Sequence, residues 1–183
     1  MARATAEGRG IAALFCIGLL GACASDAARI APQLAIDAAD LGGGRAVYLH
    51  VRDDRRDRPA PGAPLFSLAP VVREQLTAAY EAQDFRVLRR VTGDPCELTV
   101  DILALDHGAG EARAALRAVA RKGRESYGRD YAATATAGNA AAGLEAALVS
   151  AMADLARDPA LLQFLGAVCN PLPERAVEQA ARD

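Results

Sequence analysis

Residues 111–122, Glu-Ala-Arg-Ala-Ala-Leu-Arg-Ala-Val-Ala-Arg-Lys, fit either a helix or a strand. Most of these residue types are good helix formers. The apolar residues that recur at helical spacing are Leu116, Val119 and Ala120. The arginines that instead alternate with apolar residues, as on a half-buried strand, are Arg113, Arg117 and Arg121. Periodicity alone leaves both structures open, and we expect the arginines to contact solvent or to protect a sheet edge.

Beyond this segment, Gly123 suits a hairpin turn into residues 125–136, whose sequence favours a strand. Its strand-forming residues are Tyr127, Tyr131 and Thr134. Three segments that precede it also predict strands: residues 46–51, 85–88 and 97–105. In the last of these, the residues expected to share the buried face are Leu98, Val100, Ile102 and Ala104.

Helical periodicity marks three further segments. The first begins near Ser67, which can cap a helix that carries Pro70 in its first turn. Its apolar stripe comprises Leu68, Val72, Leu76, Ala79 and Tyr80. The second begins at Asn139, with a stripe of Leu144, Leu148, Ala151, Met152 and Leu155. Asp158-Pro159 ends that helix and begins a short third one, with the aspartate as cap.

The amino terminus has the pattern of a secretory signal. Arg3 and Arg9 precede an apolar run over residues 11–20. This run is too short to span a bilayer, which needs about 20 residues. The run ends in Leu20-Gly21-Ala22-Cys23, which looks like the lipobox of bacterial lipoproteins. We therefore predict a signal peptide over residues 1–22 and a lipid on Cys23. Ala22-Cys23-Ala24 also matches an ordinary cleavage site, which would release a chain that starts at Ser25.

The mature chain is expected to hold one domain. Residues 23–44 would form a lipidated tether that reaches at most about 60 Å, residues 45–169 a single periplasmic domain, and residues 170–183 a charged tail. Aromatic residues make up only 4% of the chain, so alanine and aliphatic residues must form the core. The net charge of −2 argues against a nucleic-acid partner. Ala24 after the lipidated cysteine favours the outer membrane.

The order of these elements resembles that of the YajG-like family of uncharacterised bacterial lipoproteins. The segments that carry the resemblance are the lipobox, residues 31–34, 47–53, 71–76 with 85–87, 98–105, the hairpin through Gly123 and residues 148–158. The resemblance implies a strand over residues 111–122. It implies an α+β fold in which two main helices pack on one face of an antiparallel sheet of about four to five strands. This chain departs from the family at Gln83-Asp84, where a glycine is usual, and in its cysteines beyond Cys23.

Few residues are candidates for chemistry. Cys96 and Cys169 are the even pair left in the mature chain, which suggests a disulfide in an oxidising periplasm; two buried thiols are the alternative. His50 and His107 are the only histidines, too few for a zinc site. A charged run offers a partner-binding loop and lacks the ligand spacing of a calcium site: Asp53, Asp54, Arg55, Arg56 and Asp57.

These observations predict no catalytic residue, no metal and no cofactor. We expect a membrane-anchored lipoprotein of the cell envelope whose small domain faces the periplasm and acts as an interaction or structural module. Its partners would be the membrane, through Cys23, and another envelope protein. A carrier or sensor of a lipid or cell-wall fragment is the alternative. That alternative predicts an apolar pocket lined by Leu76, Tyr80, Leu148 or Met152, whereas the first predicts a filled core.

Overall fold

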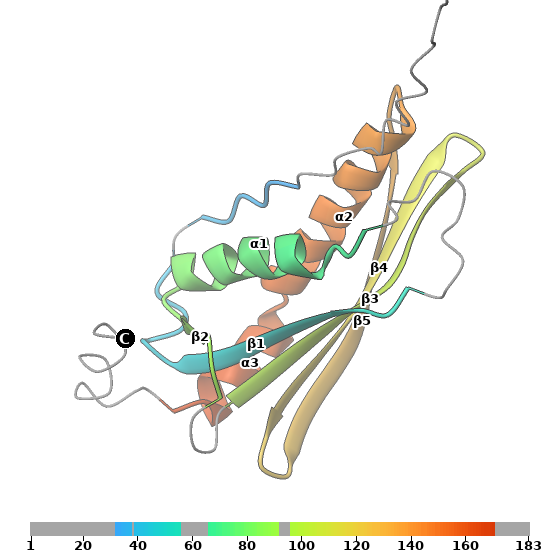
Figure 1. The fold of residues 1–183 in the computed structure, drawn as a ribbon. Helices are drawn as coiled ribbons and strands as arrows, with labels where there is room; N and C mark the ends of the chain where they lie inside the picture. Colours follow the sequence, from blue (N-terminus) through green and yellow to red (C-terminus); the bar gives the residue numbers. More distant parts are fainter. Residues whose placement is uncertain (1–31, 38, 56–65, 92–95, 171–183) are drawn as a thin grey trace, which may run out of the picture.

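A computed structural model describes residues 32–37, 39–55, 66–91 and 96–170 (Figure 1). These residues form a five-stranded sheet with the strand order β2-β1-β3-β4-β5, and three helices. The strands are β1 (Ala46–Asp53), β2 (Arg86–Leu88), β3 (Cys96–Gly108), β4 (Glu111–Lys122) and β5 (Glu125–Thr136). The helices are α1 (Ala69–Ala82), α2 (Ala140–Ala156) and α3 (Pro159–Val168). The predicted α+β class with helices packed against the sheet is confirmed.

The sheet is mixed in its strand directions. β3, β4 and β5 pair antiparallel, as expected, whereas β1 runs parallel to both of its neighbours, β2 and β3. The parallel pairing of β1 with β2 follows from their connection, because α1 carries the chain back along the sheet between them. The short β2 forms one edge of the sheet and the long β5 forms the other.

Residues 111–122 form a strand, as the family resemblance implied. β4 and β5 make a hairpin whose register runs without a shift from Lys122↔Glu125 to Glu111↔Thr136. The turn between them is Gly123-Arg124, and Gly123 has a φ of 57°, a left-handed conformation that glycine adopts without strain. A strand is stable here because its alternate residues, Ala112 to Ala120, are buried beneath the helices.

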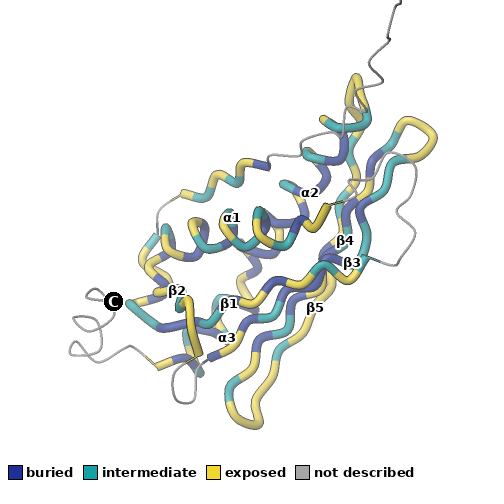
Figure 2. The backbone as a smooth tube through the Cα atoms, viewed as in Figure 1, coloured by how far each residue is buried: buried dark blue, intermediate teal, exposed yellow. Residues whose placement is uncertain are grey.

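The core lies between the helices and the inner face of the sheet (Figure 2). Alanine dominates the inner face of β4, so α2 can pack closely against it. Gly143 on α2 lies so near that an added Cβ would sit 3.1 Å from the Cβ of Ala112. The larger side chains of α1 and α2 fill the remaining space, and those with no exposed surface include Leu76, Tyr80, Leu148 and Met152.

A bulge in β3 changes which residues face the core. Ile102 pairs with Leu116 but Ala104 pairs with Ala115, so the register shifts by one residue between them. As a result Leu105 is buried and Ala104 lies on the outer face. The expectation that Ala104 would share the buried face with Leu98, Val100 and Ile102 was therefore wrong.

Part of the predicted tether packs against the domain. Leu34 and Ile36 contact the core, and the backbone N–H of Leu34 donates to Oε1 of Gln75 at 2.9 Å. Only residues 24–31 separate Cys23 from the packed chain at Pro32, which limits that distance to about 30 Å when fully extended. Within the described residues, no helix is both long and apolar enough to cross a membrane.

Candidate functional site

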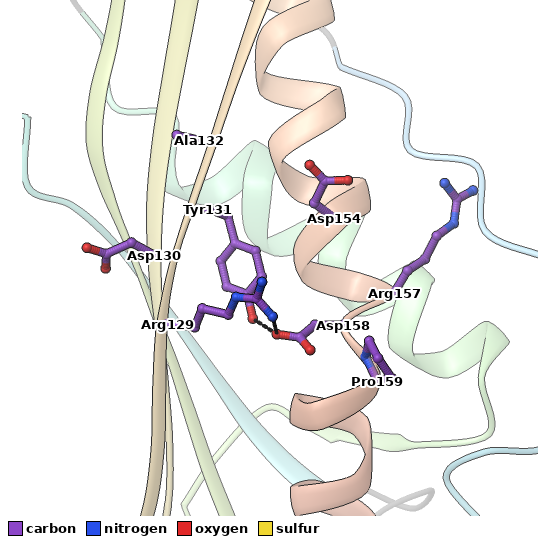
Figure 3. Close-up of a pocket in the computed structure, with 8 residues that line it drawn as sticks. All are labelled: Arg129, Asp130, Tyr131, Ala132, Asp154, Arg157, Asp158 and Pro159. Atoms are coloured by element: carbon purple, nitrogen blue, oxygen red, sulfur yellow. Dashed lines mark hydrogen bonds and ion pairs between the residues drawn. The ribbon is translucent and has the colours of Figure 1, made fainter.

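A polar groove lies between β5 and the junction of α2 with α3 (Figure 3). Its volume is about 390 Å³. The residues that line it are Arg129, Asp130, Tyr131, Ala132, Asp154, Arg157, Asp158 and Pro159. The groove therefore opens beside the edge strand of the sheet, on the face that the helices cover.

Asp158 is the structural centre of this groove. It caps α3, and its Oδ1 accepts from the N–H of Ala160 at 2.9 Å. Its Oδ2 accepts from the hydroxyls of Tyr131 at 2.6 Å and Tyr127 at 2.8 Å, and from Nη1 of Arg129 at 3.2 Å. One carboxylate thus joins the α2–α3 junction to three successive inward-facing residues of β5, which fixes the strand against the helices.

The environment shifts the pKa of several groups at this centre. Burial alone would raise the pKa of Asp158, but the hydrogen bonds that it accepts, first from Tyr131 and then from Tyr127, lower it below its ordinary value. Burial, reinforced by the charge of Asp158, raises the pKa of the Tyr131 and Tyr80 hydroxyls. The Tyr80 hydroxyl is fully buried and has no hydrogen-bond partner among the described residues. The centre therefore holds the carboxylate of Asp158 bonded to the neutral phenol of Tyr131 at physiological pH.

The other charged side chains that line the groove point in different directions. Asp130 points to the outer face of the sheet, where it accepts from Nε of Arg117 at 2.7 Å (Figure 3). Arg157 points away and donates to the carbonyl of Ala35 at 3.2 Å. Asp154 is exposed and forms no hydrogen bond or ion pair with the described residues. The groove therefore combines one engaged arginine, one saturated carboxylate and one carboxylate that is open to a ligand.

The outer edge of β5 is also open. In the hairpin with a two-residue turn, Lys122 and Glu125 form a hydrogen-bonded pair, and such pairs alternate along an unshifted ladder. Odd-numbered residues of β5 therefore bond to β4, and even-numbered residues direct their N–H and C=O groups outward. In the described part of the chain, no backbone hydrogen bond reaches these outward groups. They belong to Ser126, Gly128, Asp130, Ala132, Thr134 and Thr136.

Two of the cysteines lie among the described residues and form a covalent bond. Cys96 and Cys169 form a disulfide, with a Cα–Cα distance of 5.4 Å and a sequence separation of 73. It connects the start of β3 to the end of α3, as the sequence suggested for this pair. Cys23, the predicted lipidation site, lies outside the described residues, as do Arg56 and Asp57.

The charged run after β1 has a structural role in its first residues. Both carboxylate oxygens of Asp53 accept from Arg55 at 2.7 Å, and Oδ2 also accepts from the N–H of Leu68, one residue before α1. Burial would raise the pKa of Asp53, but these bonds lower it. Asp53 and Arg55 thus fix the two ends of the connection to α1. Asp54 is half exposed and lies 3.8 Å from Arg52, so a partner could still contact it.

The two histidines lie apart. His50 is exposed on the outer face of β1, where it pairs with Thr99, whereas His107 pairs with Ala112 near the other end of β3 and approaches Gly143 of α2. Among the described residues, no group of three or more histidine, cysteine or acidic side chains is arranged to hold a metal ion. The structure thus brings neither histidine into the groove.

Sequence reasoning missed the groove although it noted several of its residues. Asp158 was predicted only as a helix cap, and Tyr127 and Tyr131 only as strand formers. The two tyrosines are four residues apart on a strand, so they share one face, and this signal was visible in the sequence. Their common partner is 27 and 31 residues away, beyond the reach of local patterns.

Comparison with known proteins gives likeness only at the level of structure. No family model matches the chain, and no curated protein matches it. An uncharacterised protein of known structure is 12% identical with a TM-score of 0.51, covering 69% of this chain and 95% of that one. A proposed lipoprotein from Caulobacter crescentus is 16% identical (TM-score 0.38, 69% and 90%). The PelC dodecamer from Paraburkholderia phytofirmans is 10% identical (TM-score 0.37, 68% and 92%). The first of these shares the fold.

Proposed function

We propose that this chain is a bacterial lipoprotein, anchored by a lipid on Cys23 to the outer membrane, whose domain faces the periplasm as a non-catalytic interaction or structural module of the cell envelope. Membership of the YajG-like family is part of this proposal. The observation that carries it is the signal sequence that ends in Leu20-Gly21-Ala22-Cys23. Two or more acyl chains on one cysteine would make the attachment durable, because a single chain binds only marginally.

The geometry of the N-terminal segment supports a domain held near the membrane. Pro32 is buried and Leu34 and Ile36 pack against the core, so the link from Cys23 to the domain is at most about 30 Å long. A module restricted in this way meets partners that lie in or close to the membrane. Its high local concentration there favours binding through surfaces that would be weak in solution.

The interior favours an interaction module over a lipid carrier. The carrier alternative needed an apolar pocket beside Leu76, Tyr80, Leu148 or Met152, and all four side chains are fully buried in one continuous core. The groove beside β5 is polar and lies at the edge of the sheet. Recognition would therefore take place at the surface of the domain.

Crosslinking in living cells tests this proposal. The native protein would be crosslinked, purified and analysed by mass spectrometry, together with the mass of its N-terminal peptide. We expect an acylated Cys23 and one recurrent envelope protein that disappears in the variant Cys23→Ser. A co-purifying lipid or glycan without a protein partner would instead support the carrier, and an unmodified N-terminus would contradict the anchor.

A further inference from the structure

We propose that the free edge of β5 and the groove beside it form a strand-addition site, which binds an extended protein segment that carries a lysine or arginine. The segment would pair with β5 as a sixth strand and place its basic side chain in the groove. This inference rests on the proposed role as an interaction module and names the chemistry of the partner.

The length and composition of β5 suit it for this role. It spans 12 residues, about 40 Å, without a bulge. Soluble proteins protect such edges with charges, prolines, bulges or short strands. The charged residues of β5 lie in its first half, at Glu125, Arg129 and Asp130, whereas residues 131–136 contain no charge and no proline. This half is therefore open to pairing with another strand.

The groove lies where a side chain of the added strand would project. Directly opposite residues on paired strands point to the same face of the sheet. Tyr131 points to the inner face, because it is buried and bonds to Asp158. The residue of an added strand opposite Tyr131 would also point inward, beside Asp154 and Pro159. Backbone pairing with a pocket for an alternate side chain is a common mode of peptide recognition.

The charges of the groove favour a basic side chain there. Arg129 already donates to Asp158, and the other polar bonds of Asp158 leave it well satisfied. Asp154 offers a carboxylate that is unpaired among the described residues. Since Asp130 and Arg157 point away, the groove carries one negative charge in excess, which a lysine or arginine would neutralise and an acidic residue would oppose.

The test uses the mature chain with Cys23→Ser and two fluorescent nine-residue peptides of threonine and valine, one with a central lysine and one with a central glutamate. Fluorescence anisotropy measures their affinities. We expect the lysine peptide to bind about tenfold more tightly than the glutamate peptide. Asp154→Asn should weaken the lysine peptide about threefold, whereas the matched control Glu145→Gln, elsewhere on α2, should leave it unchanged.

Two further measurements locate the peptide. Ala132→Pro removes an outward N–H of β5 without removing a bond to β4, so it should abolish binding of both peptides. Amide hydrogen exchange on the unchanged chain should show protection of Asp130, Ala132 and Thr134 when the lysine peptide is added. This second measurement decides the matter even if the proline variant fails to fold.

The proposal is overturned if neither peptide binds at millimolar concentration, if these amides gain no protection, or if the glutamate peptide binds as well as the lysine peptide. The outcomes separate it from the proposed function. A partner captured in cells by both the unchanged chain and Ala132→Pro would leave the interaction module intact and contradict strand addition. Peptide binding without any captured partner would support strand addition and contradict the interaction module.

Discussion

The two halves of the sheet are joined to the helices by different means. In the half toward β2, the covalent bond from Cys169 reaches Cys96 at the start of the central strand β3, and Cys96 pairs with Val47 of β1 in the row that continues to Val87 of β2. On the side of β5, a single carboxylate, Asp158, joins the strand to the helices. The first edge has three residues and the second has 12. The difference teaches that the long edge is held in place from behind while its outward backbone groups stay open.

Removal of the disulfide should have the largest effect on this contrast. Cys96→Ser with Cys169→Ser opens a loop of 73 residues, which costs about 4 kcal/mol in the chain-entropy model. Urea unfolding would measure the loss of stability. Because Cys96 pairs with Val47 of β1 while the register between β3 and β4 begins only at Glu97, native-state hydrogen exchange should quicken in β1 and β2 before β5. A variant that loosens β5 first would contradict the division into two halves.

Asp158→Ala should have the next largest effect, on the opposite half. The change removes a helix cap and leaves the buried hydroxyl of Tyr131 and that of Tyr127 without their acceptor, so we expect a loss of about 3 kcal/mol. Asp154→Ala is the matched control, because this nearby carboxylate has no partner among the described residues. Equal losses in the two variants would refute the role given to Asp158.

Tyr131→Phe should remove less stability and change its pH dependence. An unfolded tyrosine ionises near pH 10, while burial and Asp158 raise the pKa of Tyr131 and of Tyr80 in the folded chain. Their contributions are complete below about pH 10 and are lost as the pH rises, by up to about 1.4 kcal/mol per pH unit for each group. Chemical unfolding between pH 9 and 11 should show that the stability of Tyr131→Phe falls with pH about half as steeply as that of the unchanged chain, because only Tyr80 still contributes. An unchanged slope would show that Tyr131 ionises freely.

The outer face of the sheet should respond least. Arg117 pairs with Asp101 and Asp130 in the register and donates to Asp130 at 2.7 Å, but both side chains are at least half exposed. Arg117→Ala should therefore cost little stability, because solvent screens an exposed ion pair. The matched control is Arg113→Ala, which removes a more exposed arginine from its pair with Glu111. A loss for Arg117→Ala as large as that for Asp158→Ala would mean that this face is not simply solvated.

The sequence predicted most elements because their signals are local. Asn139 and Asp158 do cap α2 and α3. The hairpin turn at Gly123 and the strand-forming residues that follow it located β5 at its observed bounds. The segment 111–122 needed the family resemblance, because alanine favours helices and the segment is a strand through its pairing with β3 and β5. Its register was also hidden, since alanines along one face permit several alignments. Acid–arginine pairs such as Glu97↔Arg121 and Asp106↔Arg113 on the other face help to fix it.

What could not be predicted depends on contacts between distant residues. The parallel pairing of β1, the bulge before Ala104 and the groove around Asp158 each require two or more elements to come together. Gln83 is a further example. It occupies the position where the family usually turns with glycine, and its buried amide donates to the carbonyls of Ala79 and Ala156, joining α1 to α2. No local pattern contains such a partner.

Photocrosslinking from the two edges in living cells tests the central claim most directly. A photoreactive phenylalanine would replace either Ala132 on β5 or Arg86 on β2 in the full chain. We predict that position 132 forms a discrete crosslinked complex, that position 86 does not, and that Asp154→Asn weakens the complex. Crosslinks from both positions alike, or from position 86 alone, would contradict the account of β5 as the binding edge.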